Sequence, residues 1–160
     1  MENVTNRWRR WIPGPRHGLP RGVAVYGVPR PDPEQLDGLL DRCHQLRAWA
    51  RAHGFELEGV PVDLGLLDQA FEEAINQADS PLGGPLPIAP VASEAGLFLG
   101  TVIIASVPGA RWRVWPNGHP VVSLPPGRDL DVVAMAHDRI SRGAPLLASA
   151  YADAVADSPR

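Results

Sequence analysis

The stretch SEAGLFLGTVIIASVPGARWRVWPNGHPVVSL, residues 93–124, is the most hydrophobic part of the chain and decides its fold. In residues 93–106 only Glu94, Thr101 and two serines are polar. Ser93 fits an N-cap, and Glu94 would complement the positive end of a helix dipole. Apolar residues fall on two adjacent helical faces, which predicts a helix buried on more than one side. Its β-branched residues leave a strand over 99–107 as the alternative.

Two glycines in this stretch, Gly96 and Gly100, are four residues apart and would bare the backbone on one side of the helix. In a water-soluble protein this spacing favours the close approach of a strand or another helix over a membrane dimer motif. The stretch is also shorter than the roughly 20 apolar residues that a bilayer-spanning helix needs.

A hairpin follows the helix. Residues 111–115 (RWRVW) alternate in polarity, residues 120–124 (PVVSL) can return beside them, and the intervening PNGH is a strong turn signal. Alternation assigns Trp112 and Val114 to the core. It assigns Arg111, Arg113 and Trp115 to the other, half-solvated face, where the guanidiniums lie near an indole.

Length and composition indicate one globular domain. The chain has 160 residues, of which 44% are hydrophobic and 21% charged. A single cysteine, Cys43, excludes an internal disulfide and fits a reducing compartment, so we expect a cytoplasmic protein. The expected fold class is α+β: one domain in which four to five helices pack on a small antiparallel sheet with a central tryptophan-rich hairpin.

The charges divide the chain into a basic arm and an acidic body. Residues 1–30 contain six arginines and one acid, Glu2, whereas the rest contains nine arginines and seventeen acids. We expect an arm over 1–30 with a short strand at 22–28, a globular domain over 31–157 and a tail over 158–160. Three interpretations of the arm stay open: it folds back on the body, it docks on a partner protein, or it contacts anionic lipid or nucleic acid.

The remaining helices are expected over 32–53, over 63–78, from Asp129 or Asp131 to Arg142, and from Pro145 onward. Cys43 falls on the buried face of the first of these, as an inert small hydrophobe. Residues 55–60 fit a strand or an extended connection. Residues 79–92 contain four prolines and two glycines, which predicts a loop, either a plain connection or a lid.

The pattern GLFLGTVI, PGARWRVWPNGHPVVSL and GRDLDVVA, together with the LRAWA segment of the 32–53 helix, resembles an actinobacterial family of small proteins described as a domain of unknown function. The resemblance covers residues 32–151 and implies no activity. The proline-rich stretch at 79–92 departs from the family pattern.

No catalytic signature is present in the sequence. The five histidines are scattered without metal-ligand spacing, and there is no phosphate loop or nucleophile elbow, so we expect no metal, no cofactor and no catalytic residue. The most enzyme-like set is Arg111, Arg113 and His119, near Asp129 and Asp131 in sequence. Two arginines on one strand face can clamp a carboxylate or a phosphate, and a histidine can act as an acid or base.

The sequence therefore predicts a small interaction or accessory protein, regulatory or immunity-like, with a protein partner. Nucleic acid and the membrane surface are not the expected partners. The expected partner-binding residues are aromatic and basic: Trp8, Arg9, Arg10, Trp11, Arg111, Arg113 and Trp115. The alternative is a small-molecule enzyme or ligand-binding protein whose pocket contains Arg111, Arg113 and His119.

Overall fold

The computed structural model describes residues 43–78 and 88–158, which form five α-helices and a three-stranded antiparallel sheet. In chain order the elements are α4 (His44–Ala52), α5 (Pro61–Ala78), α6 (Ile88–Ser106), β1 (Arg111–Val114), β2 (Pro120–Leu124), β3 (Arg128–Leu130), α7 (Val132–Arg142) and α8 (Leu147–Ala156). The predicted α+β class, with helices packed on a small antiparallel sheet, is confirmed. The predicted strand at 22–28 and the first part of the predicted 32–53 helix lie outside the described residues.

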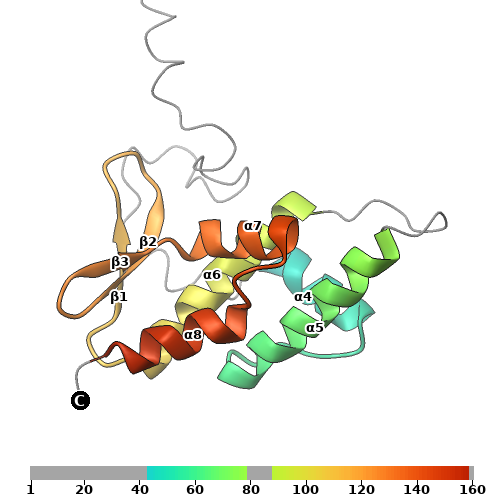
Figure 1. The fold of residues 1–160 in the computed structure, drawn as a ribbon, viewed down its shortest axis with the longest axis horizontal. Helices are drawn as coiled ribbons and strands as arrows, with labels where there is room; N and C mark the ends of the chain where they lie inside the picture. The colour runs from blue at the N-terminus through green and yellow to red at the C-terminus, as the bar shows by residue number, and fades with distance from the viewer. Residues whose placement is uncertain (1–42, 79–87, 159–160) are drawn as a thin grey trace, which may run out of the picture.

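Helix α6 is the central element of the fold (Figure 1). Helices α4, α7 and α8 and strands β1 and β2 all pack against it. Its buried side chains point in several directions around the helix axis, which confirms the prediction of burial on more than one side; they are Val91, Leu97, Phe98, Leu99, Val102 and Ile103. Within the two described segments, no helix combines the length and the hydrophobicity required to cross a bilayer.

Helix α6 begins earlier than the sequence predicts. It starts at Ile88, so residues 88–92 are helical and do not belong to the predicted loop. Pro90 is compatible with this start because the first-turn N–H groups of a helix have no intrahelical acceptor, and proline loses nothing there. Ser93 is therefore not the N-cap; it lies inside the helix and is buried.

The two glycines of α6 allow close contact with two different elements, as the sequence predicts. A Cβ on Gly96 would lie 2.6 Å from the Cα of Val133, so helix α7 approaches the α6 backbone directly. A Cβ on Gly100 would lie 2.2 Å from the Cη2 atom of Trp112, so the β1 tryptophan occupies the space of the missing side chain. One glycine thus positions a helix and the other positions the sheet.

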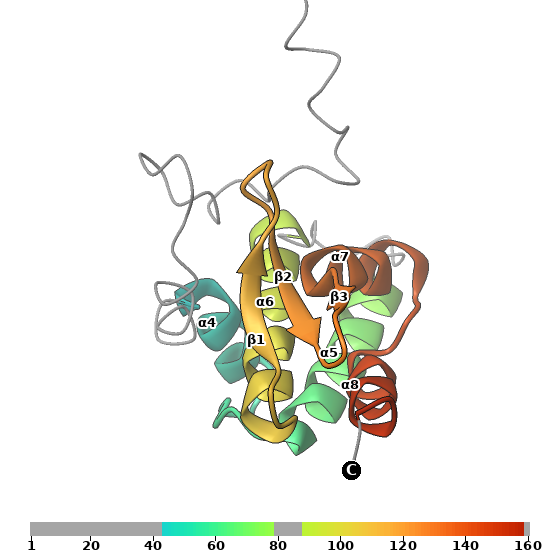
Figure 2. The ribbon, with the colours of Figure 1, turned by 90° about the vertical axis from the view of Figure 1, so that its left-hand side faces the viewer.

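The sheet has the strand order β1–β2–β3 and covers one side of α6, as Figure 2 shows from the outside of the sheet. Trp112 pairs with Val122, and both are buried on the inner face toward α6. Arg113 alternates with Trp112 and lies on the outer face. Ser123 pairs with Asp129 across β2 and β3, also on the outer face.

Strand β3 is absent from the sequence prediction, which places a helix start at Asp129 or Asp131. Residues 125–127 form a tight turn, closed by a hydrogen bond of 2.7 Å from the Gly127 N–H to the Leu124 carbonyl, and return the chain beside β2. Asp129 is consequently a strand residue. Asp131 is the N-cap of α7, where its carboxylate accepts the N–H of Ala134 at 2.9 Å.

Helix α4 is capped by a residue from another helix. Cys43 occupies its N-cap position but makes no side-chain cap bond, and instead the Glu94 carboxylate of α6 accepts the Leu46 N–H at 2.7 Å. Glu94 therefore complements the dipole of α4 and not that of its own helix. Burial raises the pKa of Glu94, and the backbone N–H groups of Leu46 and Gln45 partly oppose that rise.

Helix α5 begins at Pro61, two residues before the predicted cap Asp63. The Asp63 carboxylate reaches back from the first turn and accepts the N–H groups of Glu58, Gly59 and Val60 at 2.9, 2.8 and 3.1 Å. The segment before the helix is therefore a loop folded around a carboxylate, and residues 55–60 contain no strand.

Cys43 lies in the core, as predicted for a small hydrophobe. Burial, followed by the nearby charge of Glu94, raises the pKa of its thiol to about 12. The reactive thiolate is therefore almost unpopulated at neutral pH.

Candidate functional site

The outer face of the sheet carries a connected group of polar side chains, which we call the outer-face cluster: Arg113, Trp115, Ser123 and Asp129. The Trp115 Nε1–H donates to Asp129 Oδ2 at 2.8 Å, and Arg113 Nη1 donates to the same oxygen at 3.2 Å. Because β2 lies between β1 and β3, both side chains cross the outer side of β2 to reach Asp129. Val121 and Ser123 of β2 are accordingly buried although they face away from α6.

Asp129 carries the negative charge of this cluster. The hydrogen bond from Trp115 has the largest effect and lowers the pKa of Asp129; burial acts in the opposite direction, and contacts with Ser123 and Arg113 lower the pKa further. The carboxylate is therefore ionised at neutral pH, and it fixes an indole and a guanidinium in one arrangement.

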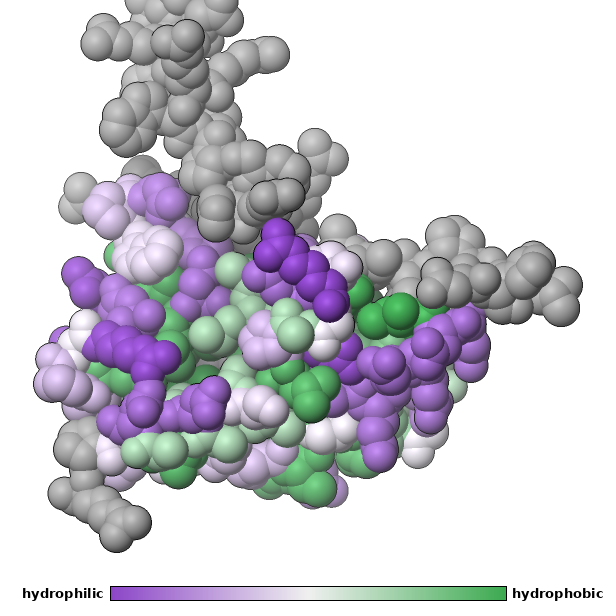
Figure 3. Space-filling model, in the orientation of Figure 1, coloured by the Kyte–Doolittle hydropathy of each residue, from purple (hydrophilic) through white to green (hydrophobic). Residues whose placement is uncertain are grey.

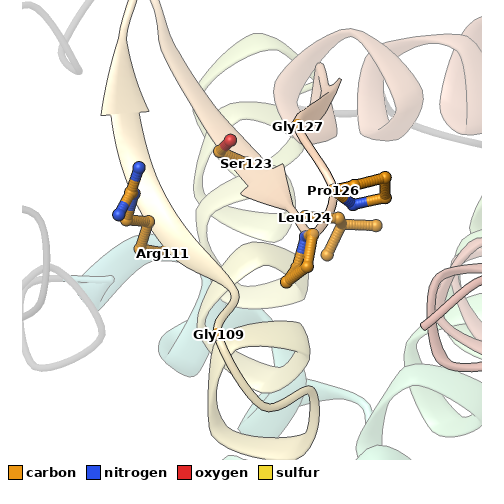
Figure 4. A pocket seen from close by; sticks show the side chains of 7 residues that line it. Gly109, Arg111, Ser123, Leu124, Pro126 and Gly127 are labelled. Carbon is orange, nitrogen blue, oxygen red and sulfur yellow. The ribbon is translucent and has the colours of Figure 1, made fainter. Parts of the chain in front are cut away.

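Arg111 lies beside this cluster on β1 but makes no hydrogen bond or ion pair with its members. Its side chain is exposed and forms no ion pair with any residue of segments 43–78 and 88–158. It lines a shallow cleft of about 280 Å³ at the end of the sheet (Figure 4), formed with Gly109, Ser123, Leu124, Pro125, Pro126 and Gly127. This cleft includes neither Arg113 nor His119.

His119 lies beside Trp115 and bonds to Asp131. It is 2% exposed, and its Nε2 lies 2.7 Å from Asp131 Oδ1, the carboxylate that also caps α7. Its other ring nitrogen, Nδ1, is buried and has no hydrogen-bond partner among the described residues. The sequence places His119 at the hairpin tip; in the structure it is buried, its carbonyl accepts the Trp115 N–H at 2.9 Å, and its ring centroid lies 5.7 Å from that of Trp115. His119 does not line the cleft that contains Arg111.

A second histidine, His137, contacts a serine in the interior. Its Nε2 lies 3.1 Å from the Ser93 hydroxyl, between α7 and α6. Burial lowers the pKa of His137, while the charges of Asp138 and Asp131 act in the opposite direction. Ser93 is 1% exposed, so its hydroxyl is out of reach of a substrate and the pair is a packing contact between the two helices.

The sequence analysis missed a buried ion pair between Arg139 of α7 and Asp68 of α5. Arg139 Nε donates to Asp68 Oδ1 at 2.9 Å, and Nη2 donates to the Asp68 carbonyl at 2.9 Å and to Glu72 at 3.1 Å. The Asp68 carboxylate also accepts the N–H groups of Leu147 and Ala148 at 2.9 and 3.0 Å and so caps α8. The available signal was the position of Asp68, four residues after Leu64 and three before Phe71 on the apolar stripe of α5.

The remaining expected site residues belong to the N-terminal arm. Trp8, Arg9, Arg10 and Trp11 lie outside the described residues, so their partner-binding role stays a prediction. Over residues 43–78 and 88–158, no group of three or more His, Cys, Asp or Glu side chains is arranged to hold a metal ion.

Comparisons with known proteins identify a family but no activity. A family model described as "Family of unknown function (DUF6278)" matches residues 4–157. No curated protein and no solved structure matches the chain.

Proposed function

Because the chain belongs to this family of unknown function, we propose from its own residues that it is a small interaction protein that binds a partner protein through the outer face of its sheet. The observation that carries this proposal is the arrangement of two exposed arginines and a half-buried tryptophan on one face: Arg111, Arg113 and Trp115. Tryptophan and arginine supply most of the binding energy in many protein interfaces.

The outer-face cluster is ordered before a partner arrives. Trp115 and Arg113 both bond to Asp129, yet 59% of the Arg113 side chain stays exposed. Side chains that are already fixed lose less conformational entropy when they enter an interface. The alternative, a ligand pocket containing His119, has no comparable support, because His119 is buried against Asp131.

The role within the cell is part of the same proposal. We infer a cytoplasmic accessory protein of a regulatory or immunity-like kind, with Trp8, Arg9, Arg10 and Trp11 as a second contact to the same partner. Deleting residues 1–20 is then expected to weaken partner capture while leaving the fold intact.

Photo-crosslinking in the native host tests the outer face directly. A benzoylphenylalanine in place of Pro116, exposed next to Trp115, is expected to give a discrete crosslinked product, whereas the same group in place of Glu73, exposed on α5, is not. In a matched capture experiment, the double variant R111Q/R113Q is expected to retain less than about a tenth of the crosslinked partner.

The control variant is R142Q, because Arg142 has a similar exposure of 56% and only a distant ion pair of 3.5 Å with Asp138. It is expected to capture the partner as the unmodified protein does. Equal capture by R111Q/R113Q and R142Q, with both variants folded by circular dichroism, would exclude the outer face as the binding surface.

A further inference from the structure

We propose that the cleft beside Arg111 binds an acidic side chain of the partner protein, with an apolar neighbouring residue against the cleft wall. This inference rests on the proposed function and specifies the chemistry of the partner. Three observations support the inference: the charge of the cleft, the residues of its walls, and its size.

Arg111 differs from every other arginine in the described residues. The other six all bond to a carboxylate or to a backbone carbonyl: Arg47, Arg51, Arg113, Arg128, Arg139 and Arg142. Arg111 has neither kind of partner among residues 43–78 and 88–158, although it is exposed and lines the cleft. Within these two segments its guanidinium is therefore a cation without a counter-ion.

The carboxylate of the outer-face cluster does not neutralise this cation. Asp129 already bonds to Trp115 and Arg113, and its side chain is only 17% exposed. The described residues as a whole contain seven arginines and twelve acids, so this part of the chain carries a net negative charge. An acidic group of a partner is thus attracted to this cleft and repelled by the net charge of the described residues around it.

A carboxylate fits the cleft better than a phosphate does. The planar guanidinium can bind both oxygens of a carboxylate at once. A dianionic phosphate needs a second cation, and the two other arginines of the sheet, Arg113 and Arg128, are bound to Asp129 and Asp157. The cleft therefore has the charge for one carboxylate.

The walls and the size of the cleft indicate what accompanies the carboxylate. Pro125 and Pro126 supply an apolar part of the lining, and Figure 4 shows Pro126 across the end of the sheet from Arg111 on β1. At about 280 Å³ the cleft is smaller than typical ligand pockets of about 300–1,000 Å³. It suits one acidic residue and part of an apolar neighbour, supplied by a larger partner, better than a free metabolite.

Peptide titration tests this inference by NMR on the ¹⁵N-labelled full chain. The probe is the blocked peptide acetyl-Ala-Leu-Glu-Leu-Ala-amide, compared with peptides in which Gln, Lys or phosphoserine replaces Glu. The Glu peptide is expected to shift the amide signals of Gly109, Arg111 and Gly127, and the Gln peptide to bind roughly tenfold more weakly. Raising the salt concentration is expected to weaken only the Glu peptide.

Charge reversal provides the second arm of the test. The R111E variant is expected to prefer the Lys peptide over the Glu peptide, while the control R142E keeps the original preference. The blocked Gln peptide is also compared with the same peptide carrying a free C-terminal carboxylate. This comparison shows whether the cleft binds the carboxylate of a side chain or that of a chain terminus. Tighter binding of the free-carboxylate or the phosphoserine peptide than of the Glu peptide, or equal binding of Glu and Gln peptides, would overturn the inference.

The two proposals fail in different ways. If the peptides do not bind the cleft but R111Q/R113Q loses the crosslinked partner, the carboxylate inference is wrong and the outer-face function stands. If the Glu peptide binds through Arg111 but capture of the partner is unchanged, the cleft recognises carboxylates and the proposed interface is wrong.

Discussion

Two arginines of this protein, Arg139 and Arg113, each bond to an aspartate and yet have opposite structural roles. The Arg139 side chain is 1% exposed and its partner Asp68 is 9% exposed. The Arg113 side chain is 59% exposed, and its partner Asp129 is largely covered. The same chemical pair therefore occurs once in the interior, among helices, and once on the outside of the sheet.

The difference lies in what each aspartate organises. Asp68 joins α5 to α7 through Arg139 and caps α8, so three helices depend on one carboxylate (Figure 1). Asp129 instead fixes two side chains that remain accessible to a partner. Removing one partner of a buried ion pair strongly destabilises the fold, because the other charge stays buried and unpaired. An exposed ion pair contributes little to stability. The Arg139–Asp68 pair therefore holds the helices together, whereas the Arg113–Asp129 pair fixes side chains at the surface.

The largest expected effect tests this contrast directly. Arg139→Met leaves Asp68 buried without its cation and is expected to lower the free energy of unfolding by about 3–5 kcal/mol. Arg113→Met removes an exposed pair and is expected to cost about 0.2–1 kcal/mol. Urea denaturation of both variants measures the two values, and similar losses would break the comparison.

A smaller effect is expected where α7 contacts α6. Gly96→Ala places a Cβ 2.6 Å from the Val133 backbone, and the resulting displacement is expected to cost about 1–3 kcal/mol. The matched control is Gly65→Ala on α5, where the added Cβ meets nothing within 4 Å. That control is expected to stabilise the protein by about 0.5–1 kcal/mol through helix propensity alone. Thermal unfolding distinguishes the two signs.

On the outer face, Trp115→Phe removes the indole N–H that bonds to Asp129. The expected loss of stability is about 1 kcal/mol, because the carboxylate retains its contact with Arg113. Partner capture is expected to fall as well, since Arg113 is then less firmly held. Unchanged capture by a folded Trp115→Phe variant would show that the arrangement of the outer-face cluster does not matter for binding.

The smallest effect is a pH dependence. The hydrogen bond from Trp115 lowers the pKa of Asp129 in the folded state. The stability that this bond contributes is therefore fully present above the carboxyl pKa of the unfolded chain, about 3.9, and is lost as the pH falls through the lower pKa of the folded state. The stability difference between the unmodified protein and Trp115→Phe should be constant from pH 7 to about pH 5 and shrink below pH 4. Denaturation midpoints at pH 3, 5 and 7 measure this difference.

Local patterns explain what the sequence predicts correctly. The apolar faces and glycine spacing of residues 93–106 are determined by neighbours three or four positions apart, and they predict both the buried helix and the close approach at Gly96 and Gly100. Strand alternation likewise places Trp112 inside and Arg111 and Arg113 outside.

The errors concern contacts between residues that are far apart in the chain. Glu94 caps a helix 48 residues earlier, and Arg139 pairs with Asp68 across 71 residues. Single-sequence patterns contain no signal for such pairs, because any acid on one helix can meet many basic or N–H groups on another. The burial of His119 likewise involves Asp131, which the sequence analysis assigns only as a potential helix cap.

Much of the outer surface gives little indication of a partner. On the side shown in Figure 3, the described hydrophobic residues occur in small groups among hydrophilic ones. Recognition through charge and a few ordered side chains, as at Arg111 and the outer-face cluster, is consistent with such a surface.

The reach of Asp68 into α8 has a consequence for synthesis on the ribosome. Its carboxylate emerges with α5, but the guanidinium of Arg139 and the N–H groups of Leu147 and Ala148 are translated 71 to 80 residues later. The Asp68 carboxylate therefore lacks these partners until α7 and the start of α8 have been synthesised, and we expect it to stay hydrated until then.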